Sequence, residues 1–100
     1  MSTWHCVGPA VALAPGTRRC VTIAGREVAV FNVEGTFYAV DNECSHLGTP
    51  LIDGFVKGCI LTCASHGWEY DLRTGAEQAG EQGVKTWVTR VEAGVLQIEG

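Results

Sequence analysis

The sequence predicts an all-β fold, a small antiparallel sandwich or partly open barrel with an inserted metal-binding subdomain. Three observations predict it: runs of β-branched and aromatic residues recur along the chain, glycine-containing turns separate them, and no stretch shows helical apolar periodicity for more than a turn or two. The chain has 100 residues, of which 46% are hydrophobic and 18% charged. This composition is typical of a single folded domain, so we expect one domain over residues 1–100.

The first part of the chain predicts an antiparallel meander. Residues 4–7 form a short expected strand, and Gly8-Pro9 and Pro15-Gly16 prevent a continuous helix in the connection that follows. Turns at Gly25-Arg26 and Glu34-Gly35 then separate three further strands. These strands are expected at residues 20–23, 27–33 and 36–40.

The second part combines loops with shorter strands. Residues 41–54 are rich in turn formers and predict a loop, and a hairpin around Gly58 is expected to deliver Cys63 at its end. The inserted subdomain is therefore expected over about residues 41–72. The polar segment 76–85 is expected to be irregular, and Ala93-Gly94 joins the last two strands. The strands expected here are 55–57, 59–62, 68–72, 86–91 and 95–98.

Four potential metal ligands occur in two short loops. Cys44 and His46 are separated by one residue, sixteen residues follow (47–62), and Cys63 and His66 are separated by two. Thiolates and imidazoles bind soft or borderline metals. Structural zinc is one interpretation, since two Cys and two His can close a tetrahedral site, but zinc ligands in one knuckle are usually about two to four residues apart. The mixed order favours a dinuclear centre in which both thiolates bind one iron and both imidazoles the other.

At these residues the sequence resembles a known family. The pattern C-x-H-x16-C-x2-H, followed by the run HGWEYDLRTG at residues 66–75, resembles Rieske-type [2Fe-2S] ferredoxins. The resemblance implies one [2Fe-2S] cluster, with Cys44 and Cys63 on the inner iron. It also implies that His46 and His66 bind the outer iron through Nδ1, and that electrons enter and leave at this histidine end.

The family resemblance also implies a role. Thr49 and Ser65 stand where respiratory and photosynthetic relatives carry a loop disulfide, and 100 residues leave no room for the second domain of an oxygenase. We therefore expect an electron carrier and not an enzyme. Its implied partners are a flavin-containing NAD(P)H-dependent ferredoxin reductase and a terminal aromatic-ring dioxygenase or related oxygenase. The alternatives are the small subunit of an assimilatory nitrite reductase and a zinc-stapled interaction module.

Charge and cysteine usage bear on the partners and the compartment. The net charge is −4 with no run of lysine or arginine, which argues against nucleic acid and anionic membrane surfaces. No segment approaches the roughly eighteen apolar residues of a membrane span, and the N-terminus does not look like a signal peptide. Outside the motif, an odd number of cysteines remains: Cys6, Cys20 and Cys59. Free thiols fit a reducing compartment, so we expect a cytoplasmic protein.

Several residues near the motif have two interpretations. Cys59 is expected to be a buried strand thiol and not a further ligand, and His5 a frayed terminal side chain. Trp68 either shields the cluster or belongs to the core. Leu47 and Pro50 are expected to form an apolar docking patch beside the histidines. Four acidic residues near the motif either steer a basic partner or are simply solvated: Glu43, Asp53, Glu69 and Asp71.

Overall fold

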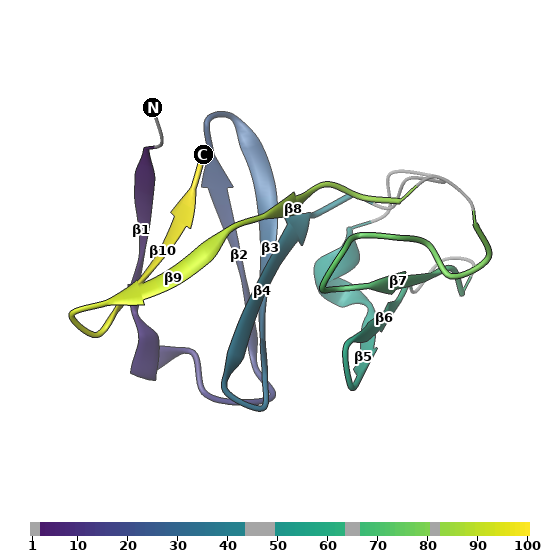
Figure 1. Ribbon diagram of the computed structural model, residues 1–100, viewed down its shortest axis with the longest axis horizontal. Helices are drawn as coiled ribbons and strands as arrows, with labels where there is room; N and C mark the ends of the chain where they lie inside the picture. The colour runs from purple at the N-terminus through teal and green to yellow at the C-terminus, as the bar shows by residue number, and fades with distance from the viewer. Residues whose placement is uncertain (1–2, 44–49, 64–66, 81–82) are drawn as a thin grey trace.

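The computed structural model describes residues 3–43, 50–63, 67–80 and 83–100. Its secondary structure is almost entirely antiparallel β, in three sheets with no closed barrel among the described residues (Figure 1). The all-β prediction is therefore confirmed. Two short 3-10 turns, η1 (Ala10–Ala12) and η2 (Leu51–Asp53), are the helical segments of this part of the chain. Neither is long and apolar enough to cross a membrane, and no other described segment is helical.

A four-stranded sheet confirms the predicted meander. Its strand order is β2-β3-β4-β8. The two hairpin turns place Ala24 and Gly25, and Glu34 and Gly35, at positive φ. Two consecutive positive φ angles define the tight turn whose twist matches that of the strands it joins, which is why a glycine occurs in each. The strands are β2 (Arg18–Ile23), β3 (Arg26–Val33), β4 (Thr36–Asp41) and β8 (Thr86–Trp87).

A second sheet, of order β1-β10-β9, joins the two ends of the described chain. Its strands are β1 (Trp4–Pro9), β9 (Thr89–Glu92) and β10 (Val95–Glu99). The single strand expected at 86–91 was wrong, because this segment divides between two sheets: β8 pairs with β4, and β9 pairs with β10. A strand that changes sheets makes a corner between packed layers. His5 was also wrongly expected to fray, since it lies within β1 opposite Ile98.

The third sheet follows β4 and precedes β8 in the chain. It has the order β5-β6-β7 and stands to one side of the other two sheets (Figure 1). Its strands are β5 (Phe55–Lys57), β6 (Ile60–Thr62) and β7 (Glu69–Asp71). The expected strand at 68–72 is thus shorter than predicted, and Trp68 precedes it.

The four-stranded sheet forms the middle layer of the molecule. On β3, Val28 and Val30 belong to one buried apolar cluster, whereas Ala29 and Phe31 belong to the other. Successive strand residues point to opposite faces, so β3 is buried on both of them. One cluster packs against the β1-β10-β9 sheet through Leu96 and Ile98. The other packs against the third sheet and contains Leu51, Leu61, Cys63, Tyr70 and Leu72.

We predict that Gly75→Ala destabilises the protein much more than Gly58→Ala. Both glycines have positive φ (80° and 59°), but a Cβ on Gly75 would lie 2.1 Å from the carbonyl oxygen of Val84, whereas one on Gly58 would meet open space. Left-handed strain costs about 1–2 kcal/mol at either site, and overpacking adds about 1–3 kcal/mol at Gly75. Urea denaturation of both variants measures the difference, and equal losses would contradict the close approach.

Candidate metal centre

Of the four predicted ligands, the structure describes Cys63. Cys44, His46 and His66 lie outside the described residues, as do Leu47, Thr49 and Ser65. Among the described residues, no three His, Cys, Asp or Glu side chains come together as metal ligands. The site is therefore defined here by Cys63 and by the residues that flank the two ligand loops.

The second ligand loop begins and ends at hydrogen-bonded residues. Cys63 directly follows β6 and is 1% exposed. Its amide donates to the carbonyl of Trp68 (2.7 Å), and the amide of Gly67 donates back to the carbonyl of Cys63 (3.1 Å). Gly67 has φ of 73°, which favours glycine. These contacts fix the chain on both sides of residues 64–66.

The first ligand loop is likewise held where it begins and ends. Asn42, which is 4% exposed, directly follows β4, and its Oδ1 accepts from the amide of Ile52 in η2 (2.7 Å). The backbone amide of Asn42 donates to the carbonyl of Glu27 (2.9 Å). The side-chain Nδ2 of Asn42 lies 3.5 Å from Sγ of Cys20. A buried amide side chain that uses both its ends fixes the separation of the elements that it joins.

The ends of both loops meet in one apolar cluster. Leu51 follows the first loop and is fully buried, and it shares this cluster with Cys63 and Tyr70. Trp68 packs against the same cluster while remaining partly exposed. Trp68 therefore belongs to the core with part of its side chain and is exposed with the rest. Leu51, after the first loop, and Cys63, at the start of the second, therefore lie in the same apolar core, and the Cys63 thiol is buried there.

The segment after Gly75 is hydrogen-bonded to β7. The amide of Gln78 donates to the carbonyl of Glu69 (2.8 Å), and the amide of Asp71 donates to the carbonyl of Ala76 (2.9 Å). Tyr70 and Glu77 form a β-bridge. One bridge thus places residues 76–78 antiparallel along β7, whereas the described part of 76–85 contains no strand or helix and is irregular, as expected.

The remaining described cysteines lie apart from Cys63. Cys59 lies in the turn before β6 and is only half-buried, so the expectation of a buried strand thiol was wrong; the three residues of β6 separate it from Cys63. Cys6 and Cys20 are exposed on β1 and β2, the edge strands of their sheets. Partial desolvation of its sulfur and the nearby Glu27 carboxylate raise the pKa of the Cys20 thiol.

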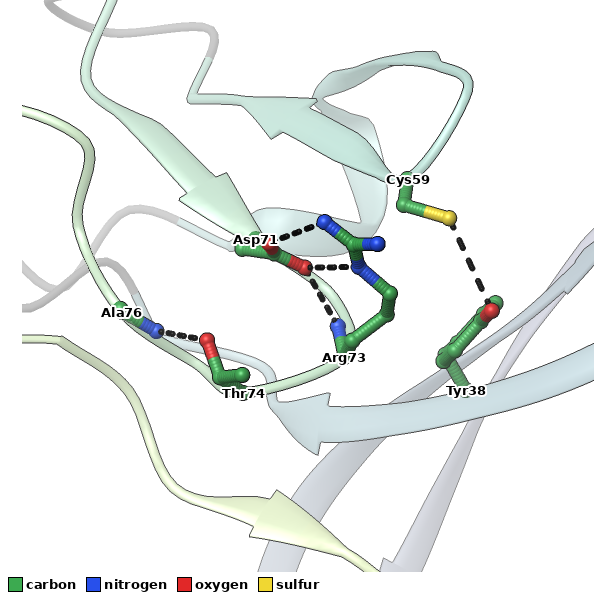
Figure 2. A network of polar contacts seen from close by, with 6 residues as sticks. All are labelled: Tyr38, Cys59, Asp71, Arg73, Thr74 and Ala76. Atoms are coloured by element: carbon green, nitrogen blue, oxygen red, sulfur yellow. Dashed lines mark hydrogen bonds and ion pairs between the residues drawn. The ribbon is translucent and has the colours of Figure 1, made fainter.

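Polar contacts lie at the end of β7 and close to it (Figure 2). The guanidinium of Arg73 donates to both carboxylate oxygens of Asp71, at 3.0 and 2.8 Å. These hydrogen bonds hold the pKa of Asp71 below its usual value. Nearby, Sγ of Cys59 lies 3.6 Å from Oη of Tyr38 on β4, and this contact is the main cause of the raised pKa of Tyr38.

Exposed groups surround the ends of the ligand loops. Pro50 is exposed at the end of the first loop, and the side chain of Phe55 is 71% exposed. Phe55 pairs across the hairpin with Thr62, the residue before Cys63. Glu43, Asp53 and Glu69 are exposed, whereas Asp71 is paired with Arg73. Exposed apolar and acidic side chains thus occur next to the described ends of both loops.

Comparison with known proteins agrees with these features. The sequence model of the Rieske [2Fe-2S] domain family matches residues 3–90 of this chain. The ferredoxin component of a naphthalene 1,2-dioxygenase system from Pseudomonas aeruginosa is 35% identical over 81 residues, which cover 79% of this chain and 78% of that protein.

Solved structures share the whole fold. The ferredoxin of carbazole 1,9a-dioxygenase from Nocardioides aromaticivorans IC177 superposes with a TM-score of 0.89 at 27% identity, over 97% of each chain. A complex of reduced oxygenase and oxidized ferredoxin in carbazole 1,9a-dioxygenase contains a chain that matches as well, with a TM-score of 0.89 and 28% identity over 97% of this chain and 93% of that one. A nitrite reductase small subunit from Mycobacterium tuberculosis reaches 0.92 at 22% identity, over 100% of this chain and 96% of that one, which shows the fold alone.

The chain belongs to the Rieske [2Fe-2S] domain family. Within that family it is a ferredoxin, an electron carrier whose cofactor is a Rieske-type [2Fe-2S] cluster. The buried thiol of Cys63, at the point where the apolar cluster meets the ligand loops, fits a thiolate ligand of this cofactor. The zinc interpretation is thereby set aside.

Sequence reasoning missed three residues that shape this region. Asn42 and Arg18 hold the end of the first loop through side-chain hydrogen bonds, and Phe55 lies in the strand expected at 55–57 but is exposed. An asparagine two residues before the first ligand was the available signal for Asn42. Arg18, the first of two adjacent arginines, gives no such signal, because its partners are backbone carbonyls far along the chain.

We predict that Arg73→Met removes stability at neutral pH but not in acid. Because the folded-state pKa of Asp71 is depressed, the pair contributes stability that is present above the unfolded pKa and lost as pH falls through the folded one. The gap in unfolding free energy between wild type and variant should therefore close below about pH 4. Urea denaturation measures this gap. The measurements cover the pH range in which visible absorption shows that the cluster is retained. Lys57→Met is the control, and a gap that persists unchanged in acid would refute the mechanism.

Proposed function

We propose that this ferredoxin carries single electrons from a flavin-containing NAD(P)H-dependent reductase to the terminal oxygenase of a ring-hydroxylating dioxygenase system. The observation that carries the proposal is the match, over most of both chains, to the ferredoxin component of a naphthalene 1,2-dioxygenase system. The likeness to a ferredoxin that occurs in a complex with its oxygenase supports an oxygenase as the acceptor. A flavin reductase is the usual donor in such systems.

The proposal includes a cytoplasmic location. The thiols of Cys6, Cys20 and Cys59 are free, and two of them are exposed. Exposed free thiols persist in a reducing compartment. The small subunit of a nitrite reductase shares the fold, but a sequence relative that matches over most of both chains is a dioxygenase ferredoxin, and this favours the oxygenase system.

The ligand set that we propose is Cys44 and Cys63 on one iron and His46 and His66 on the other. The spacing of these residues supports it, as does the burial of Cys63 beside an apolar cluster. Because imidazoles donate less electron density than thiolates, His46 and His66 would make the iron that they hold the more readily reduced of the two. The chain's own part is to hold these side chains and to present that end to a partner.

The docking surface that we propose lies around the ligand loops. Phe55 and Pro50 provide apolar area, and Glu43, Asp53 and Glu69 border it with negative charge. An exposed aromatic side chain is a common centre of a transient interface, and an acidic rim increases the rate of encounter with a basic partner.

The first test concerns the ligands. Protein purified from iron-replete cells is expected to be coloured and, when reduced, to give a Rieske-type electron paramagnetic resonance spectrum. Cys63→Ser and His66→Ala should abolish both signals, whereas Cys59→Ser and Cys20→Ser, which change cysteines outside the proposed ligand set, should retain them. A colourless preparation that contains only zinc, or an unchanged spectrum in Cys63→Ser, would overturn the assignment.

The second test concerns docking. Phe55→Ala should raise the ferredoxin concentration that gives half-maximal turnover of the terminal oxygenase by about tenfold, since truncating a central aromatic residue of an interface typically costs 1–2 kcal/mol or more, about tenfold per 1.4 kcal/mol. Val11→Ala serves as the matched control, because Val11 is 89% exposed but lies in η1, between β1 and β2. The reduced-state spectrum should be unchanged in both variants. Equal effects of the two substitutions would contradict a docking role for Phe55.

A further inference from the structure

Arg18 joins the four-stranded sheet to the end of the first ligand loop. It lies on β2, an edge strand, and its Nη1 donates to the carbonyl of Ile52 (2.9 Å) and to the carbonyl of Gly54. Its guanidinium carbon is 5.2 Å from the centroid of the Phe31 ring, and Phe31 is its cross-strand partner. The guanidinium is thus oriented by the sheet and directed at η2.

The two acceptors of Arg18 lie at the end of η2, where a helical turn leaves carbonyls without partners in the turn itself. The amide of Ile52 is held as well, by Oδ1 of Asn42. Both polar backbone groups of Ile52 therefore bind side chains from the four-stranded sheet. One of these side chains follows β4 and the other extends from β2, so the turn is held from two strands.

The contact of Arg18 reaches the second ligand loop through Gly54. A Cβ on Gly54 would lie 2.5 Å from the carbonyl oxygen of Thr62 and 2.9 Å from Cδ1 of Leu61, so its backbone packs directly on β6. Thr62 is the residue before Cys63. Arg18 therefore holds the end of the first loop against β6, the strand that leads directly to Cys63 in the second loop.

We propose that Arg18 is a positioning residue for the cluster: by holding Ile52 and Gly54 against β6, it fixes the separation of the two ligand loops and slows loss of the bound cluster. This inference rests on the proposed ligand set. Hydrogen bonds from a charged donor are roughly twice as strong as neutral ones, and this pair is partly buried. Arg18 does not touch the cluster in this scheme but acts through η2.

The experiment compares holo-proteins carrying Arg18→Met, Arg18→Lys and Arg19→Met. Arg19 is the matched control, because it is the next residue on β2, carries the same charge, and makes one long hydrogen bond to the carbonyl of Val7 (3.4 Å). Decay of visible absorption in excess iron chelator gives the rate of cluster loss. Hydrogen–deuterium exchange of the oxidised holo-protein shows whether the amides of Ile52 and Gly54 open.

Arg18→Met is expected to lose its cluster about tenfold faster than wild type, with faster exchange confined to η2 and its flanks. Arg18→Lys, which keeps the charge but not the forked donor, should fall between the two. Arg19→Met should stay within about twofold of wild type, the scatter expected of a surface substitution.

Three results would overturn the inference. One is a rate of cluster loss in Arg18→Met equal to that in Arg19→Met. Another is exchange that accelerates equally in η2 and throughout β2, β3 and β4, because Arg18 would then stabilise only the fold. If Arg18→Met does not fold, Arg18→Lys decides, and a rate equal to that of Arg19→Met excludes the role. A wild-type protein without the Rieske spectrum would instead refute the proposed function itself.

Discussion

The structure depends on hydrogen bonds that close the two ligand loops where they begin and end. Asn42 and Arg18 bind both polar groups of the Ile52 backbone, and Cys63 exchanges backbone hydrogen bonds with Gly67 and Trp68. A buried backbone group without a partner costs about as much as a lost hydrogen bond or more, so these contacts strongly favour one path for the chain. The end of the first loop is thus held by residues outside the proposed ligand set, and the second loop is closed through the backbone of Cys63, one of the proposed ligands.

These contacts hold because the sheet behind them is buried on both faces. Alternate residues of β3 enter two separate apolar clusters, and only one of these contains Cys63 and Leu51. The β1-β10-β9 sheet covers the opposite face and thereby keeps the middle layer rigid. A small domain buries a limited area, and here a single strand contributes to two cores. The third sheet thus packs on the four-stranded sheet, which packs in turn on the β1-β10-β9 sheet.

Much of the fold could be predicted from the sequence. Runs of β-branched and aromatic residues and the glycine turns between them located the β2-β3-β4 meander to within two residues, because these signals are local. The corner between β8 and β9 could not be predicted, since Trp87, Val88 and Thr89 continue a strand pattern without glycine or proline. The role of Arg18 was equally hidden, because the carbonyls of Ile52 and Gly54 lie 34 and 36 residues away. At the site, residue types and spacing identified the candidate ligands but not the residues that hold their loops.

An electron carrier imposes a particular demand on such loops. Its charge changes by one unit in each transfer while its ligands stay the same, so any rearrangement between the two states adds to the barrier. Hydrogen-bond donors and acceptors that are already in place do not need to reorganise when the charge changes. Fixing the ends of each loop on the sheet, as Asn42 and Arg18 do for the first loop, meets this demand without adding contacts at the exposed surface. That surface then stays available to the electron donor and acceptor that we propose.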